Sequence, residues 1–215
     1  MTVKQSNYIK LAAITAMLID HIGLIFFPEA VVFRIIGRIA FPLFAYQLSV
    51  GYINTRNFNR YFLRLFVFGL VLQLLYIIAL FFLKTDFNLY RLNIFFTLTF
   101  GLLAIYFYDS KKYIYLLAII AASPFINLDY GTYGISLILF LYIFRSRKLY
   151  IFLILSVLST IFCCIGGSSI QLFSILSFFF IAMPLSVNIN IPNKFFYFFY
   201  PLHLAVLYLL KIVLL

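Results

Sequence analysis

The chain has 215 residues, of which 66% are hydrophobic, 21% are aromatic and only 10% are charged. Soluble globular domains are roughly 25% charged, so this composition excludes a water-soluble fold and predicts a protein whose solvent is the lipid bilayer. The formal net charge is +11, but the basic residues form short clusters between apolar runs. That pattern argues against nucleic-acid binding, which uses one continuous basic face.

Nine apolar segments follow one another along the chain, and each is predicted to be a membrane-spanning helix. A helix needs about 20 apolar residues to cross a bilayer, which leaves room for about nine crossings and for no soluble domain beside them. We therefore predict an all-α fold, a polytopic transmembrane helix bundle that forms one integral membrane domain over residues 1–215. The predicted ranges are 9–27, 31–53, 61–83, 93–108, 113–126, 133–144, 149–165, 170–187 and 195–213.

The fifth and sixth segments are shorter than a full crossing. Pro124 and the polar stretch 127–134 interrupt them. Each is therefore either a complete span or a broken, re-entrant helix.

The distribution of Lys and Arg predicts the orientation, because cytoplasmic loops carry the excess of basic residues. With the N-terminus in the cytoplasm, most basic residues fall on the cytoplasmic side, and Lys84 and Arg91 are the main exceptions. We predict a multi-pass membrane protein with a cytoplasmic N-terminus. The basic residues on the cytoplasmic side are Lys4, Lys10, Arg56, Arg60, Arg64, Lys111, Lys112, Arg145, Arg147, Lys148 and Lys194.

Ionisable residues inside the first two segments are functional candidates, because a charge near the bilayer centre costs several kcal/mol. At 1.5 Å per residue, Asp20 and His21 lie about 10 Å below the outer end of the first segment. Arg34 and Arg38 lie about 5 and 10 Å below the outer end of the second, so Arg38 is level with the other two.

Two interpretations of this group remain. Asp20 and Arg38 could form a buried pair that fixes helix packing. Alternatively, the group lines a polar cavity that opens to the outside, and the number of polar groups at one depth favours this view. Further polar residues lie on the predicted outer side. We predict that they form the binding site of a substrate that approaches from outside, which we call the acceptor site. It consists of Arg34, Arg91, Asn93, Asp129, Tyr130 and Gln171.

His21 is suited to act as a general base, because a neutral imidazole takes up a proton near pH 7. Asp20 and Arg38 are predicted to complete the catalytic group. The other histidine, His203, lies about 12 Å from the inner end of the ninth segment, where packing and function are equally plausible.

On the cytoplasmic side, Lys10, Arg56, Arg60 and Arg64 either follow the positive-inside rule alone or bind the phosphates of a donor such as coenzyme A. We assign them, with His203, as candidate cofactor contacts. Cys163 and Cys164 are adjacent in an apolar stretch, which fits neither a metal site nor a disulfide framework, so we predict two core residues and no metal.

Several stretches, in order along most of the chain, resemble the TraX family, which is named for an enzyme that acetylates the N-terminus of conjugative pilin. The first helix also resembles that of the broader membrane acyltransferases, in which a basic residue, here Lys10, is followed after ten intervening positions by a histidine, here His21. The stretches are IKLAAITAMLIDHIG (9–23), FRIIGRIAFPLFAYQLSVGYINTRN (33–57), NIFFTLTFGLLAIY (93–106), DYGTYG (129–134), QLFSILS (171–177) and YFFYPLHLAVLYL (197–209).

The resemblance implies acetyl transfer from cytosolic acetyl-CoA, used as a co-substrate, to an acceptor outside the membrane, with His21 catalytic and Lys10 at the coenzyme. The expected location is the bacterial plasma (inner) membrane, and the expected partners are the lipid bilayer, the acyl-CoA donor and an extracytoplasmic peptide or glycan acceptor. The alternative function is a small-molecule transporter or proton-coupled permease that uses the same buried charges. A noncatalytic assembly factor for a surface polymer or secretion system is a third possibility.

Overall fold

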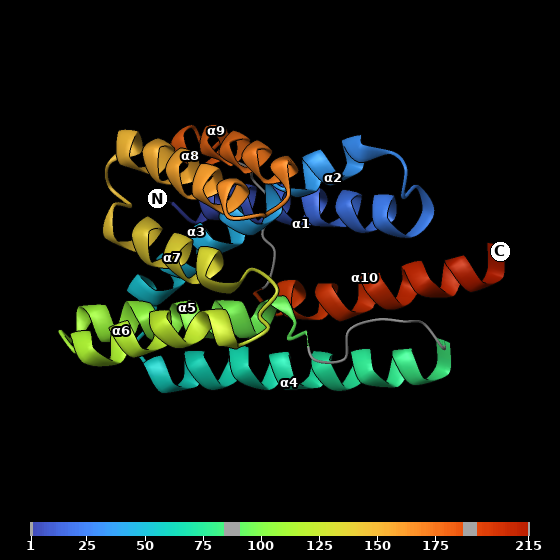
Figure 1. Ribbon diagram of the computed structural model, residues 1–215, viewed down its shortest axis with the longest axis horizontal. Helices are drawn as coiled ribbons and strands as arrows, with labels where there is room; N and C mark the ends of the chain where they lie inside the picture. Colours follow the sequence, from blue (N-terminus) through green and yellow to red (C-terminus); the bar gives the residue numbers. More distant parts are fainter. Residues whose placement is uncertain (1, 84–90, 187–192, 215) are drawn as a thin grey trace. The chain divides into compact units, whose positions relative to one another are not determined.

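The computed structural model describes residues 2–83, 91–186 and 193–214, and the regular structure in these ranges is entirely helical (Figure 1). The prediction of an all-α fold is confirmed. The α-helices are α1 (Val3–Phe26), α2 (Val31–Gly37), α3 (Ala40–Asn54), α4 (Phe58–Leu83), α5 (Ile94–Asp109), α6 (Tyr113–Ala122), α7 (Gly131–Ile143), α8 (Lys148–Cys164), α9 (Ser177–Ala182) and α10 (Asn193–Leu214), and the 3₁₀ segments are η1 (Ser123–Phe125) and η2 (Ser169–Leu176).

Each predicted apolar segment corresponds to one or two helical segments, although residues 183–186 of the eighth are not helical and its residue 187 lies outside the described ranges. Within these ranges, three helical stretches are long and apolar enough to cross a membrane: Val3–Phe26, Val31–Asn54 and Phe58–Ile78. The other apolar helices have 10–17 residues. The chain therefore has the helices of a membrane protein, whereas nine complete crossings and the orientation of the N-terminus stay predictions.

The second predicted segment is broken near its middle, between α2 and α3, at Arg38 and Ile39. Pro42, three residues into the next helical stretch, explains the break. Proline has no N–H to donate to the carbonyl of Arg38, and its ring collides with that carbonyl in a continuous helix. The break sets Arg38 at a helix end inside an apolar stretch, where non-helical backbone needs polar or protein surroundings.

The chain forms two compact units, and their boundaries fall within α3 and in the connection between α7 and α8. Unit 1 consists of Met1–Gln47 and Ser146–Leu215, and unit 2 of Leu48–Arg145. In unit 1, α1 packs against α2 and α10, and α8 packs against η2 and α9. The prediction of a single domain stays a prediction.

Unit 2 is built around α5, which packs against α4, α6 and α7. Its core contains Phe96, Ala104 and Ile135 together with neighbouring aliphatic and aromatic side chains. At one end of this unit, the Asp109 carboxylate accepts hydrogen bonds from the hydroxyls of Tyr52 (3.1 Å) and Tyr142 (2.9 Å). This carboxylate ties the ends of three helices together.

Small polar contacts also join helices in unit 1. The buried hydroxyls of Ser159 on α8 and Ser174 on η2 lie 2.7 Å apart. Such contacts are typical of helices in lipid, where close approach replaces the hydrophobic effect. Cys163 is half-buried and Cys164 is exposed, so the prediction of a core position is wrong for Cys164.

Candidate functional site

One face of α1 carries both Lys10 and His21. They are 11 residues apart, which is three full helical turns plus about 20°, so the two side chains leave the helix in nearly the same direction. They are about 16 Å apart along the helix axis. Asn7, Ile14 and Met17 complete the same stripe, and all three are buried. The spacing predicted from the sequence therefore places the two residues on the inward-facing side of this helix.

His21 pairs with the other histidine of the chain. Its Nδ1 lies 2.8 Å from Nε2 of His203, and the two ring centroids are 4.9 Å apart. Nδ1 of His203 lies 2.8 Å from the backbone carbonyl oxygen of Phe199, one turn earlier on α10. His203 is buried, whereas His21 remains partly exposed.

Two aromatic rings of α10 frame this pair. The ring of Phe199 stacks on His203, with centroids 5.1 Å apart and planes inclined by 10°. Tyr200 presents an edge to both imidazoles, at 6.2 Å from His21 and 5.5 Å from His203. Neither aromatic residue was among the predicted site residues.

Asp20 makes a separate group with the two arginines of the broken segment. Arg34 donates from Nη1 to Asp20 Oδ2 at 2.7 Å, whereas Nη2 of Arg38 lies 4.0 Å from Asp20 Oδ1. Arg38 also donates from Nη1 to Oε1 of Gln171 at 3.4 Å. The tightest partner of Asp20 is thus Arg34 rather than Arg38, which the structural interpretation of the sequence had paired with it.

The approach of α2 to α1 at this point depends on Gly37. A Cβ built at Gly37 meets the Cβ and Cγ of Asp20 at 2.4 Å each, so only glycine permits this spacing. Gln171 is almost fully buried on the 3₁₀ segment η2. The group of Asp20, Arg34 and Arg38 has two guanidinium groups for one carboxylate, so it carries an excess positive charge among apolar helices.

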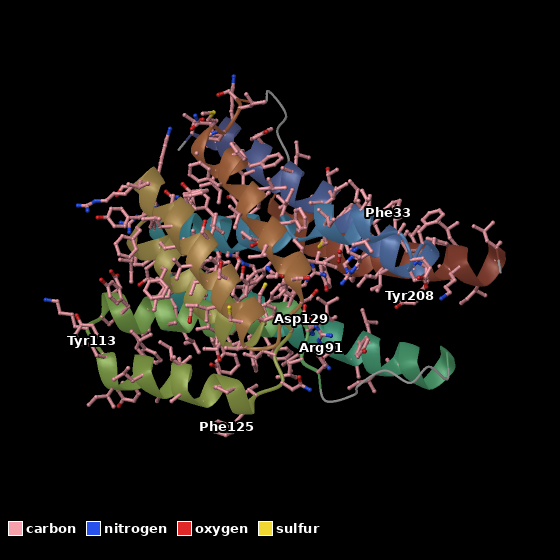
Figure 2. All side chains as sticks on the ribbon, turned by 45° about the horizontal axis from the view of Figure 1, so that its top comes forward. Phe33, Arg91, Tyr113, Phe125, Asp129 and Tyr208 are labelled. Atoms are coloured by element: carbon pink, nitrogen blue, oxygen red, sulfur yellow. The ribbon has the colours of Figure 1, made fainter. Side chains whose placement is uncertain are left out.

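The remaining predicted acceptor residues lie in unit 2. Arg91 and Asp129 form an ion pair (Figure 2). Asn93 caps α5, accepting from the N–H of Phe95 at 3.0 Å, and its amide donates to the Gln73 side chain at 3.0 Å. The Asn93 contacts therefore connect the start of α5 to the interior of α4.

Tyr130 is half-buried at the start of α7. Of the predicted acceptor site, Arg34 and Gln171 belong to the group around Asp20 and Arg38 in unit 1, and Arg91 pairs with Asp129 in unit 2.

The predicted cofactor contacts are also divided. Lys10 and His203 belong to unit 1, and Lys10 is half-buried. Arg56, Arg60 and Arg64 are exposed at and just before the first turns of α4, in unit 2. Their assignment to a coenzyme stays a prediction.

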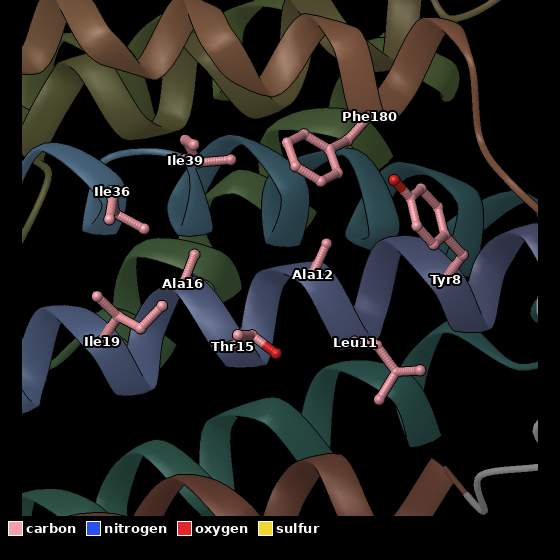
Figure 3. A pocket seen from close by; sticks show the side chains of 9 residues that line it. All are labelled: Tyr8, Leu11, Ala12, Thr15, Ala16, Ile19, Ile36, Ile39 and Phe180. Atoms are coloured by element: carbon pink, nitrogen blue, oxygen red, sulfur yellow. The ribbon is translucent and has the colours of Figure 1, made fainter.

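A groove of about 320 Å³ follows another face of α1 (Figure 3). On the helical wheel its α1 residues point away from His21 and Lys10, at roughly 100° per residue. Its lining is almost entirely apolar and consists of Tyr8, Leu11, Ala12, Thr15, Ala16, Ile19, Ile36, Ile39 and Phe180.

Comparison with known proteins identifies the family. A family model described as TraX protein matches residues 5–211. An uncharacterised protein of Rickettsia prowazekii (strain Madrid E) is 30% identical over 158 residues, which cover 67% of this chain and 58% of that protein.

A probable fimbrial assembly protein, FimC of serogroup H1, from Dichelobacter nodosus is 32% identical over 139 residues, or 59% of this chain and 57% of that protein. The chain thus spans less than two thirds of the length of these curated relatives. No solved structure matches it. The chain belongs to the TraX family.

Proposed function

We propose that this protein is a membrane-embedded acetyltransferase that moves an acetyl group from cytosolic acetyl-CoA to an amine or hydroxyl of an extracytoplasmic acceptor. The observation that carries the proposal is the histidine pair. A partly exposed imidazole, His21, is held at 2.8 Å by a buried imidazole within an apolar bundle. A packing contact does not require two imidazoles, one of them buried, beside three charged side chains on α1, on α2 and in the turn that follows α2.

In the proposed reaction, His21 takes the proton from the acceptor N–H or O–H bond. The freed lone pair attacks the carbonyl carbon of the thioester, and the C–S bond breaks. The leaving thiolate takes up the proton from His21, which regenerates the base. Arg38 is proposed to stabilise the oxyanion that forms on the carbonyl oxygen, because its long contacts to Asp20 and Gln171 leave its guanidinium only weakly engaged there.

The donor is proposed to approach from the side of Lys10. This cation shares the inward face of α1 with His21 and lies three turns away, so one extended molecule could contact both. Its ammonium would bind a phosphate of the coenzyme as a point charge. Arg56, Arg60 and Arg64 of unit 2 stay candidate contacts for coenzyme phosphates, since all three are exposed on the predicted cytoplasmic side.

The acceptor is proposed to be a surface polymer subunit, with a peptide N-terminus or a glycan as its reactive part. The likeness to a probable fimbrial assembly protein supports a role in pilus biogenesis. The excess positive charge around Asp20, Arg34 and Arg38 would suit an acceptor with an acidic group near its nucleophile.

The broken segment at Arg38 favours one rival function, because discontinuous helices with charged residues also form the substrate sites of transporters. A transporter would not require a CoA thioester. Binding of acetyl-CoA therefore separates the two functions.

The test uses the purified protein in detergent, with an acetyl-labelled donor and a peptide amine as acceptor. Acetyl-CoA at 100 times its Kd should stabilise the protein by about 2.7 kcal/mol, and free acetate should not. His21→Ala should lower transfer roughly 10²- to 10⁴-fold and keep this stabilisation, because removing a base need not weaken donor binding.

Thr15→Ala is the matched control on α1, since Thr15 lines the groove on the face turned away from His21. It should transfer acetyl at the wild-type rate. Near-normal transfer by His21→Ala would reduce the histidine to a packing residue, and absence of stabilisation by acetyl-CoA would refute the donor.

A further inference from the structure

We infer that His203 is a positioning residue that fixes the tautomer of His21, so that Nε2 of His21 is the atom that accepts the proton. This inference rests on the proposed function for its chemical meaning. The hydrogen-bond geometry on which it is built does not depend on any activity.

The direction of the hydrogen bonds follows from one carbonyl. A backbone carbonyl oxygen only accepts, so the 2.8 Å contact between His203 Nδ1 and the Phe199 oxygen requires a proton on Nδ1 of His203. In neutral imidazole only one nitrogen carries a proton. Nε2 of His203 then has a lone pair and must accept from its neighbour.

The neighbour is Nδ1 of His21, at 2.8 Å. It must therefore carry the proton that the bond requires, and Nε2 of His21 is left with the lone pair. Two neutral rings and one carbonyl thus form a chain in which each N–H donates in the same direction. The backbone of α10 determines which nitrogen of α1 is basic.

The arrangement also supports His21 after it has taken up a proton. An imidazolium has N–H at both nitrogens, so Nδ1–H of His21 still donates to His203 while Nε2 holds the transferred proton. A hydrogen bond from a charged donor is stronger than one from a neutral donor. The pair therefore stabilises the protonated base without any rearrangement of the rings.

Packing around His203 keeps it in this position. Its ring is stacked on Phe199 and edged by Tyr200. Pro201 lies two residues before it and removes one N–H from the helix. The aromatic neighbours of the buried His203 ring therefore belong to α10, and its polar contact is with His21 on α1.

The tautomers are measurable because the chain has two histidines in all. Protein labelled with ¹⁵N in the imidazole rings gives four ring nitrogen signals, and the single variants assign them. At about pH 8, which is above the usual pKa range of histidine side chains, both rings should be neutral. Both Nδ1 atoms should then be protonated, and both Nε2 atoms should carry lone pairs. A proton on Nε2 of His21 would overturn the inference.

Substitutions at position 203 give the second measurement. In His203→Gln the amide oxygen reaches about as far as the original Nε2 and can accept from His21, so Nδ1–H of His21 should persist and transfer should remain within roughly tenfold. His203→Phe keeps an aromatic ring for stacking and has no acceptor. It should give a mixture of His21 tautomers and leave protonated His21 without its hydrogen-bond acceptor, and the two effects together should lower transfer roughly 10²-fold.

Leu207→Ala is the matched control, because Leu207 is buried one turn further along α10 and its side chain forms no hydrogen bonds. It should lower thermal stability and leave the His21 tautomer unchanged. Equal losses of transfer in the Gln and Phe variants, with no change of tautomer, would reduce His203 to a structural residue. A wild-type protein with the expected tautomers but no acetyl transfer would refute the proposed function and leave the hydrogen-bond chain standing.

Discussion

Gly37→Ala tests whether the close approach of α2 to α1 holds the charged group together. The added Cβ would lie 2.4 Å from the Cβ of Asp20, and ordinary contact begins near 3.4 Å. Rotating the Asp20 side chain does not move its own Cβ, so the helices must separate by roughly 1 Å. The 2.7 Å bond from Arg34 to Asp20 then lengthens beyond hydrogen-bonding distance.

The expected loss combines the strain of overpacking with the weakened charged hydrogen bond, about 2–4 kcal/mol in total. For a chain of this length it corresponds to a decrease in Tm of roughly 5–15 °C, measurable by a thermal shift assay in detergent. Gly69→Ala is the control, since its added Cβ would meet Phe95 at an ordinary 3.4 Å, and Tm should be unchanged or higher. Equal Tm values for the two variants would refute the argument that Gly37 sets this spacing.

Two further predictions concern the topology and Arg38. A cysteine introduced at Glu29 should react with a membrane-impermeant reagent applied from outside, whereas one at Asn57 should not, and the reverse pattern would contradict the predicted orientation. Arg38→Lys should lower acetyl transfer roughly 10²-fold with little change in Tm, because lysine cannot reproduce the guanidinium fork and Arg34 already makes the tight bond to Asp20. A lysine variant with wild-type transfer would remove Arg38 from the proposed catalytic group.

The helices could be predicted from the sequence because apolar runs between polar breakers are a strong signal in a membrane protein. The break between α2 and α3 was not predicted, although Pro42 marks it in the sequence. The predicted segment 31–53 was long and apolar enough to pass as one helix, and Arg38 was placed by counting residues along it. The 3₁₀ conformation of η2 likewise leaves no trace in hydropathy.

The sequence placed the charged residues of the first two segments in one group, but it did not predict which side chains form contacts with one another. Asp20, Arg34 and Arg38 do lie together, because they are close in sequence on two consecutive helices. The contact between His21 and His203 was missed. Their depths were counted from opposite ends of segments far apart in the chain, and errors of a few residues at each end exceed the length of a hydrogen bond.

The Asp109 cluster was missed for a similar reason. Tyr52, Asp109 and Tyr142 stand at the ends of three predicted segments, where a tyrosine ordinarily indicates the membrane interface. A direct bond from two hydroxyls to one carboxylate depends on how helices rotate about their axes. The spacing of residues within one segment does not show how that helix is rotated relative to a neighbouring helix.

The two compact units also bear on the order in which the protein is made. Unit 1 joins residues 1–47 to residues 146–215, so all of unit 2 is synthesised between its two parts. The first helix pair can bring Asp20 to Arg34 early, since only 14 residues separate them. His21 must wait until position 203 has been synthesised, 182 residues later. A ribosome that stalls within unit 2 therefore leaves a chain whose charged group is assembled while its histidine pair has not yet formed.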